Sequence, residues 1–244
     1  IDVVLELPFP WSSSSAAFFA AAGVSVADKI GANELVFASE CGDISEIRRA
    51  AEVSAMFDNE IIKTDRHSAD GIAAMREKYA IEHGISPSLF RTPNNILAAE
   101  YVRFAGASLS LSTVKRRSGP CYASATDVRK LLLSNGDAGA YVPQDLYAGY
   151  VRRISGQEYA VNSELADIER RAFLFSESDS AGIFDADGGL GERIIDAARR
   201  SVSGVEMIET AKTKKYTDSR IRRAALYMLL GVTETDIRPL PEYT

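Results

Sequence analysis

The chain has 244 residues, a length that is enough to bury the core of one large domain or of two smaller ones. Hydrophobic residues make up 46% and charged residues 25%, as in ordinary globular proteins, and the apolar stretches are too often interrupted for a transmembrane helix. The net charge of -6 argues against indiscriminate nucleic-acid binding but is compatible with a local basic patch.

Cysteine and histidine are scarce in this sequence. The two cysteines, Cys41 and Cys121, cannot build a disulfide framework, and they lack the spacing of a zinc site. His67 and His83 are the only histidines. We therefore expect no metal site and a reducing, cytoplasmic compartment.

Strands alternate with helices in the first half of the chain. Short apolar and alternating runs predict strands over residues 1–8, 34–39 and 109–116. Helical spacing and capping residues predict one helix that ends at Gly31, one that starts near Asp43, one over 72–84 and one over 92–106. Residues 58–70 are predicted to form a loop, and a further helix opens at Ser124. This order indicates a parallel α/β sheet over roughly residues 1–135.

No strand is predicted beyond residues 135 and 136. Apolar residues recur at helical spacing over 146–154, 165–175 and 190–202. The last helix places five apolar side chains on one face and ends at Gly231; they are Ile221, Ala224, Ala225, Met228 and Leu229. The sequence therefore predicts an α/β domain over 1–136 and a helical domain over 137–244.

The first candidate site is the helix start Thr92-Pro93-Asn94-Asn95. A helix N-terminus presents unpaired N–H groups and a partial positive charge, which suit a phosphate or the edge of a nucleotide. The two asparagine amides would add donors and acceptors for a base or a ribose. The alternative is that these residues do no more than start a helix.

The second candidate is the segment Ser124-Ala125-Thr126-Asp127-Val128-Arg129. Two hydroxyls at a helix start, with Arg129 one turn later, are suited to a triphosphate. Lys115, Arg116 and Arg117 end the preceding strand and strengthen this interpretation, because ligands bind beyond the carboxyl ends of parallel strands. The alternative is a capping box that is followed by a solvated arginine.

The third candidate is a basic segment over residues 212–223. Between residues 210 and 223 there are six basic residues and one acidic residue. Basic side chains with a tyrosine among them suit an RNA backbone and an unstacked base. The residues expected to contact RNA are Lys212, Lys214, Lys215, Tyr216, Arg220, Arg222 and Arg223. The alternative is a solvated basic helix face.

Several short segments carry a family resemblance when they are taken in order. They are Asp2-Val3-Val4-Leu5-Glu6-Leu7-Pro8, Phe37-Ala38-Ser39-Glu40, Pro93-Asn94-Asn95-Ile96-Leu97, Thr113-Val114-Lys115-Arg116, Ser124-Ala125-Thr126, Gly189-Leu190-Gly191-Glu192-Arg193 and Lys214-Lys215-Tyr216-Thr217. Together they resemble the tRNA(Met) cytidine acetate ligase family. The resemblance spans almost the whole chain, and the ordered set is more specific than any single motif.

The resemblance implies a Rossmann-like, parallel-sheet nucleotidyltransferase domain of the HIGH type, followed by a helical domain that binds tRNA. Members of the family activate acetate with ATP, which Mg²⁺ accompanies, and acetylate the wobble cytidine of elongator tRNA(Met). By this resemblance Ala38, Asn94 and Arg116 would contact ATP, and Ser124, Thr126 and Arg129 would shape the phosphate end. The family usually has glycine where this chain has Ala38, and a methyl group there would restrict the approach of the backbone to a nucleotide.

The family's first strand and its His-x-Gly-His motif would precede Ile1. We therefore expect the catalytic residues to lie upstream, and we expect this chain to be an N-terminally truncated, catalytically incomplete piece. One alternative is an adenylyltransferase of the same fold that acts on a small metabolite, although such a substrate needs no basic surface. The other is a non-catalytic RNA-binding module, which Ala38 and the absent motif would suit.

Overall fold

The computed structural model describes residues 2–61, 72–107, 109–117, 123–134, 136–155, 162–174 and 180–238. The chain divides into two compact units. The first unit comprises residues 1–116 and 166–244, and the second comprises residues 117–165. Each unit is described by itself below.

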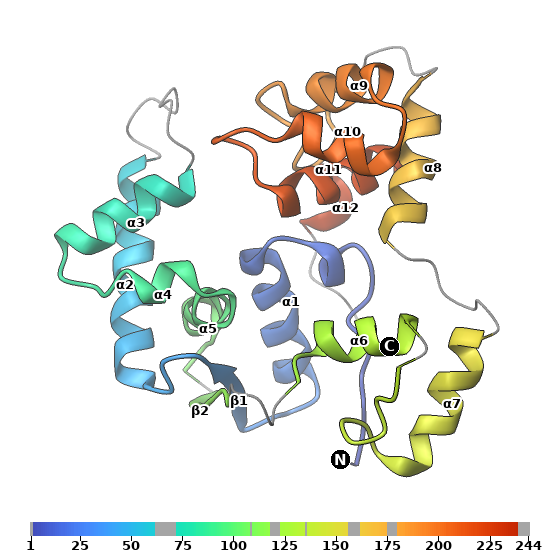
Figure 1. Ribbon diagram of the computed structural model, residues 1–244. Helices are drawn as coiled ribbons and strands as arrows, with labels where there is room; N and C mark the ends of the chain where they lie inside the picture. The colour runs from blue at the N-terminus through green and yellow to red at the C-terminus, as the bar shows by residue number, and fades with distance from the viewer. Residues whose placement is uncertain are drawn as a thin grey trace. The chain divides into compact units, whose positions relative to one another are not determined.

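A two-stranded parallel sheet lies in the first unit (Figure 1). Strand β1 (Glu34–Ser39) pairs with β2 (Ser110–Lys115) in a register that runs from Glu34 opposite Ser110 to Ser39 opposite Lys115. Two of the three predicted strands and their parallel arrangement are thus confirmed.

The strand predicted over residues 1–8 is wrong for the part that the structure describes. Residues 2–8 have no strand conformation and pair with no described strand. The side chains of Val3 and Val4 are 71% and 83% exposed. An apolar run forms a strand only where a neighbouring strand accepts its hydrogen bonds, and none does so here.

Five helices accompany the sheet in residues 16–104. They are α1 (Ala16–Lys29), α2 (Ile44–Ile61), α3 (Ile72–Glu82), α4 (Ser88–Arg91) and α5 (Pro93–Phe104). Asp43 starts α2 as expected, because its Oδ1 accepts hydrogen bonds from the backbone N–H groups of Ser45 (2.8 Å) and Glu46 (3.2 Å). The loop predicted over 58–70 is wrong at residues 58–61, which continue α2, the helix that the buried side chains of Val53 and Phe57 anchor. Residues 62–70 lie outside the described ranges.

The core of the sheet lies on one of its faces. Phe37 of β1 packs there against Ile47 and Ala51 of α2 and against Ala98 and Ala99 of α5. The pleat turns alternate residues the other way, so Val36 and Val114 stand on the opposite face and are more than half exposed. Helices α2 and α5 therefore fix the carboxyl ends of both strands.

The regular elements in the rest of the described chain are helices, apart from one isolated bridge between Ile183 and Thr233. Helices α6 (Ala125–Leu133) and α7 (Gln144–Ser155) lie in the second unit. They are followed by α8 (Asn162–Leu174), α9 (Leu190–Arg200), α10 (Gly204–Ala211), α11 (Asp218–Leu230) and α12 (Glu234–Ile237). The predicted last helix is confirmed, with Ile221, Ala224 and Ala225 fully buried and Gly231 in the left-handed region at φ 69°.

The start of the chain packs on the last helices. The indole Nε1 of Trp11 donates to the carbonyl of Ile237 (3.1 Å), and the hydroxyl of Tyr227 donates to the carbonyl of Pro10 (3.3 Å). The rings of Phe18 and Phe184 meet edge to face at 5.0 Å. The first unit therefore combines both halves of the sequence. The predicted boundary at residue 136 falls inside the second unit, and the division into domains over 1–136 and 137–244 stays a prediction.

Glu169 of α8 gives a first prediction, on the pH dependence of stability. It is 3% exposed, and burial raises the pKa of its carboxyl from 4.5 to about 7, against the opposing charge of Arg222. The folded state thus holds the proton more tightly than the unfolded state. The contribution of Glu169 to the free energy of unfolding should therefore fall as the pH rises from about 4.5 to 7, by about 1–3 kcal/mol.

The variant Glu169→Gln should lack this part of the pH dependence, because the amide does not titrate. We expect it to be more stable than the parent at pH 8 and to approach the parent at pH 5. Urea unfolding of both proteins across this range measures the difference. A difference that is the same at every pH would contradict the assignment.

Candidate functional site

The chain turns sharply at the carboxyl end of β1. Ser39 is fully buried, and its Oγ lies 2.8 Å from Oγ1 of Thr113 and accepts a hydrogen bond from the N–H of Gly42 (3.0 Å). Gly42 has φ +71°, and a Cβ there would lie 2.6 Å from the Cβ of Lys115. Only glycine fits this turn, which projects Glu40 toward the start of α5.

The carboxylate of Glu40 binds the N-terminus of α5. Its Oε2 accepts from the N–H of Asn95 (2.8 Å), and its Oε1 accepts from Nδ2 of Asn94 (2.6 Å) and from the N–H of Asn94 (3.3 Å). Oδ1 of Asn95 in turn accepts from the N–H groups of Glu40 (3.0 Å) and Cys41 (3.1 Å). The prediction of unpaired N–H groups at this helix start is therefore wrong, because a carboxylate of the same chain already occupies them.

These hydrogen bonds decide the charge of Glu40. Burial alone would raise its pKa, but the hydrogen bonds from Asn94 and Asn95 together outweigh burial and lower the pKa. The carboxylate is therefore ionised at neutral pH, next to the positive end of the helix dipole.

Asn94 and Arg116 come together beside this turn. Nη1 of Arg116 donates to Oδ1 of Asn94 (3.3 Å), and the backbone N–H of Arg116 donates to the carbonyl of Ser39 (2.8 Å). Glu40 holds the amide of Asn94 by its nitrogen, so its oxygen faces Arg116. Ala38, opposite Val114 in the sheet, lies in the strand that leads to this turn.

Ser124, Thr126 and Arg129 belong to the second unit, whereas Asn94 and Arg116 belong to the first. The capping box that the sequence indicates at Ser124 is confirmed: its Oγ accepts from the N–H of Asp127 (3.2 Å), and Asp127 Oδ2 accepts from the N–H of Ser124 (3.1 Å). Nη2 of Arg129 donates to Oγ1 of Thr126 (3.4 Å). All three side chains are exposed at the start of α6.

The basic segment is only partly helical, which corrects the expectation of a basic helix. Residues 212–217 precede α11, which begins at Asp218. Tyr216 is 6% exposed, and its hydroxyl donates to the carbonyl of Gly188. Lys215 and Arg220 lie over its ring, at 5.1 Å and 5.4 Å from the ring centre. The ring of Tyr216 therefore packs within the chain and is not presented to an unstacked base.

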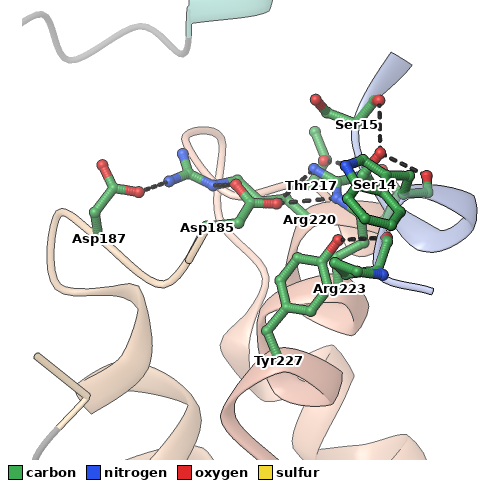
Figure 2. Close-up of polar contacts among 11 residues, drawn as sticks. Ser14, Ser15, Asp185, Asp187, Thr217, Arg220, Arg223 and Tyr227 are labelled. Atoms are coloured by element: carbon green, nitrogen blue, oxygen red, sulfur yellow. Dashed lines mark hydrogen bonds and ion pairs between the residues drawn. The ribbon is translucent and has the colours of Figure 1, made fainter. Parts of the chain in front are cut away.

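Acidic residues pair with most of the cations of the basic segment. Asp185 lies between two arginines, with Arg223 at 2.8 Å and Arg220 at 3.1 Å, and Asp187 also binds Arg220 at 2.5 Å (Figure 2). Asp185 adopts φ 61°, a conformation that is strained for a residue other than glycine, and the two guanidinium groups hold it there.

The remaining cations divide into paired and unpaired ones. Arg222 binds Asp218 (2.8 Å), and Lys212 binds Glu209 (2.5 Å) and Asp218 (3.0 Å). Lys214 and Lys215 form no ion pair with any residue in the described ranges. The local excess of positive charge that the sequence suggests is therefore reduced to a few side chains.

Residues that flank two of the segments that carry the resemblance link these segments. The carbonyl of Gly188 receives the hydroxyl of Tyr216, and Nε of Arg193 donates to the carbonyl of Ala211 (2.7 Å), directly before the basic segment. Gly191 passes so close to Ser180 that a Cβ would lie 2.2 Å from it. These residues support the local fold, and sequence reasoning missed the roles of Glu40, Asp185 and Asp187.

The described residues include neither a membrane-spanning helix nor a cluster of metal ligands. None of the helices there is both long and apolar enough to cross a bilayer. No three histidine, cysteine, aspartate or glutamate side chains in the same ranges are placed to share a metal ion.

The role of Glu40 gives a second prediction. Glu40→Gln keeps the size of the side chain but turns one acceptor oxygen into a donor, so Asn94 or Asn95 loses its partner. We expect the free energy of unfolding at pH 7 to fall by about 1–2 kcal/mol. The loss should shrink in acid, because the parent carboxylate then becomes protonated as well. Chemical unfolding at pH 7 and in acid measures both effects.

Glu34→Gln is the matched control for this experiment. Glu34 begins the same strand and accepts one exposed hydrogen bond from Ser112 (2.7 Å). Its replacement should change stability by less than about 0.5 kcal/mol. If both variants lose the same amount, Glu40 has no special part in holding α5.

The sequence of this chain is similar to those of known proteins. The profile described as HIGH Nucleotidyl Transferase matches residues 1–243. The chain is 28% identical to the tRNA(Met) cytidine acetate ligase of Thermoanaerobacter sp. (strain X514), over 95% of its own length, and 28% identical to that of Bacillus licheniformis, over 97%. It spans 63% of the length of each of these relatives.

Solved structures agree with the sequence comparison. The crystal structure of Thermotoga maritima TmcAL bound with alpha-thio ATP matches with a TM-score of 0.82 at 27% identity, over 97% of this chain and 61% of that one. The apo form of the same protein matches equally well, at 26% identity. The resemblance and the fold class predicted from the sequence are confirmed. Since the family profile covers nearly every residue, this chain belongs to the HIGH nucleotidyl transferase family.

Proposed function

We propose that this chain is the nucleotide- and tRNA-binding part of an enzyme that acetylates a cytidine of tRNA(Met) at the expense of ATP. The observation that carries the proposal is the Asn94–Arg116 pair, which stands at the carboxyl ends of two parallel strands. Ligands bind at that edge in sheets of this type. The similarity to proteins named tRNA(Met) cytidine acetate ligase, and to one bound with an ATP analogue, supports the choice of substrates.

The proposed reaction has two steps. An oxygen of acetate attacks the α-phosphorus of ATP and displaces pyrophosphate, which gives acetyl-adenylate. The exocyclic amine of the wobble cytidine then attacks the acetyl carbonyl and releases AMP. Both steps move negative charge onto oxygen atoms, so the protein assists them by placing fixed donors next to those atoms.

The guanidinium of Arg116 is suited to bind a nucleotide. Its guanidinium is exposed and uses one hydrogen bond to hold Asn94, which leaves further donors for a phosphate or ribose oxygen. The helix start itself offers little to a phosphate, because Glu40 fills it. Ser124, Thr126 and Arg129 are proposed for the phosphate end, and Ala38 for contact with the nucleotide. Mg²⁺ would arrive on the triphosphate, and we assign it no protein ligand.

A third prediction concerns these two residues. In the full-length enzyme, Asn94→Ala and Arg116→Ala should each reduce ATP-dependent acetate activation about ten- to a hundredfold, also without tRNA, because each removes a charged or charge-supported hydrogen bond. Exchange of labelled pyrophosphate into ATP measures this step. The control is Arg200→Ala, an exposed arginine of α9 that is paired with Asp196. Normal exchange in both site variants would overturn the nucleotide assignment.

The basic segment is proposed to contact tRNA, and the ion pairs refine which residues contribute. A cation that already has a carboxylate partner releases fewer counterions when a phosphate binds. We therefore propose Lys214 and Lys215 as the main phosphate contacts, and smaller contributions from Lys212, Arg220, Arg222 and Arg223. A small-metabolite adenylyltransferase is the second candidate, and it would have no use for such contacts.

A fourth prediction follows from this difference. Lys214→Gln and Lys215→Gln should each flatten the salt dependence of tRNA binding, by about 0.7–0.9 in the slope of log K against log salt. Arg222→Gln should flatten it less, because Asp218 already neutralises that guanidinium. Filter binding across a salt series measures the slopes. Equal slopes for all three variants and the parent would leave the basic segment without a role in binding.

A further inference from the structure

Helix α7 carries a stripe of partly exposed side chains in the described part of the second unit. Leu146, Gly149, Tyr150 and Arg153 are spaced so that they share one helix face, and together they line a cavity of about 250 Å³. Leu146 is 50% exposed and Tyr150 is 45% exposed. Tyr147 points the other way and donates from its hydroxyl to Oδ1 of Asp137 (3.1 Å). The helix is thus held from one side and open on the other.

Gly149 adds no side chain to this face, and a Cβ there would meet no atom within 4 Å. Tyr150 lines the same cavity and is 45% exposed, so part of its ring is open. One face of an exposed aromatic ring is therefore accessible to a flat group. Stacking on such a ring is a usual way for proteins to bind an unpaired base.

One cation lies beside this ring, and a second follows it in the chain. Arg153 lines the same cavity as Tyr150, Arg152 and Arg153 are both exposed in the last turn of α7, and neither forms an ion pair with a residue that the structure describes. Two carboxylates of the second unit have other partners: Asp127 caps α6, and Asp137 binds Gly139 and Tyr147. Arg220, Arg222 and Arg223 in the basic segment, by contrast, all have carboxylate partners.

We propose that this face of α7, lined by Leu146, Gly149, Tyr150 and Arg153, binds an unpaired stretch of the RNA substrate. A base stacks on Tyr150, and Arg152 and Arg153 bind the adjoining phosphates. The proposal rests on the proposed function, and it adds a contact surface to the basic segment. Uncompensated arginines beside a small apolar stripe favour a polyanion with flat groups over a protein partner, whose interface would need a larger apolar area.

The test uses the 244-residue chain and a labelled RNA hairpin with an unpaired loop. Tyr150→Ala should weaken hairpin binding about five- to a hundredfold without changing its salt slope, because stacking releases no counterions. Tyr150→Phe should bind like the parent, because the ring is retained. The double variant Arg152→Gln/Arg153→Gln should flatten the slope by about 1.4, since each contact to a single strand contributes about 0.7. Fluorescence anisotropy across a salt series measures all three.

The matched control is Arg48→Gln/Arg49→Gln. These are also consecutive, exposed arginines of a helix, α2, and they too form no ion pair with a described residue. Their replacement should leave the slope within about 0.3 of the parent, because these arginines are not part of the proposed RNA surface. Equal losses in the control and in the α7 variant would overturn the proposal, and so would equal losses of hairpin and fully paired duplex on Tyr150→Ala. Self-association that Tyr150→Ala abolishes would assign the face to a second copy instead.

The failure of this proposal differs from the failure of the proposed function. If the parent binds tRNA and the α7 variants bind it equally well, only the α7 surface is wrong. If the parent binds no tRNA at all, the tRNA assignment itself falls. Far-UV circular dichroism of each variant establishes that α7 remains folded, as expected for exposed positions.

Discussion

A single carboxylate joins the sheet to the helix that carries Asn94. Glu40 leaves β1 through a turn that Ser39 and Gly42 shape, and it accepts hydrogen bonds from the first residues of α5. Because the same carboxylate orients the amide of Asn94, the position of Arg116 depends on it as well. The pair is set without any ligand, and in the proposed nucleotide role this would lower the cost of ordering donors on binding. The anion at this helix start is the protein's own.

Sequence patterns predicted the elements whose causes are local. Helix periodicity and capping residues gave α1, α5, α6 and α11, since these signals act within one or two turns. The apolar run at Val3 and Val4 misled, because a strand depends on a neighbour that no local pattern reveals. The bond between Glu40 and Asn94 joins residues that are 54 positions apart, and no local pattern in either segment predicts it.

The charge of the basic segment could not be predicted from the local sequence either. Counting residues over 210–223 suggested a strong basic patch, but Asp185 and Asp187 lie more than 30 positions upstream of the arginines that they pair with. Their loop has an unusual backbone at Asp185, which only the folded chain explains. Net charge over a short window is therefore a poor guide to free cations. The second unit shows the opposite case. Its acidic and basic residues balance in number, yet Arg152 and Arg153 form no ion pair with a described residue.

The contact between Trp11 and Ile237 has a practical consequence. Trp11 is the only tryptophan of the chain, so all indole emission comes from one place, where the beginning of the sequence meets its last helices. The ring lies partly shielded, with its N–H bound to a backbone carbonyl. Separation of the two segments would expose the indole to water and move its emission to longer wavelength. The protein thus carries an intrinsic optical reporter of whether its two ends are docked, without any added label.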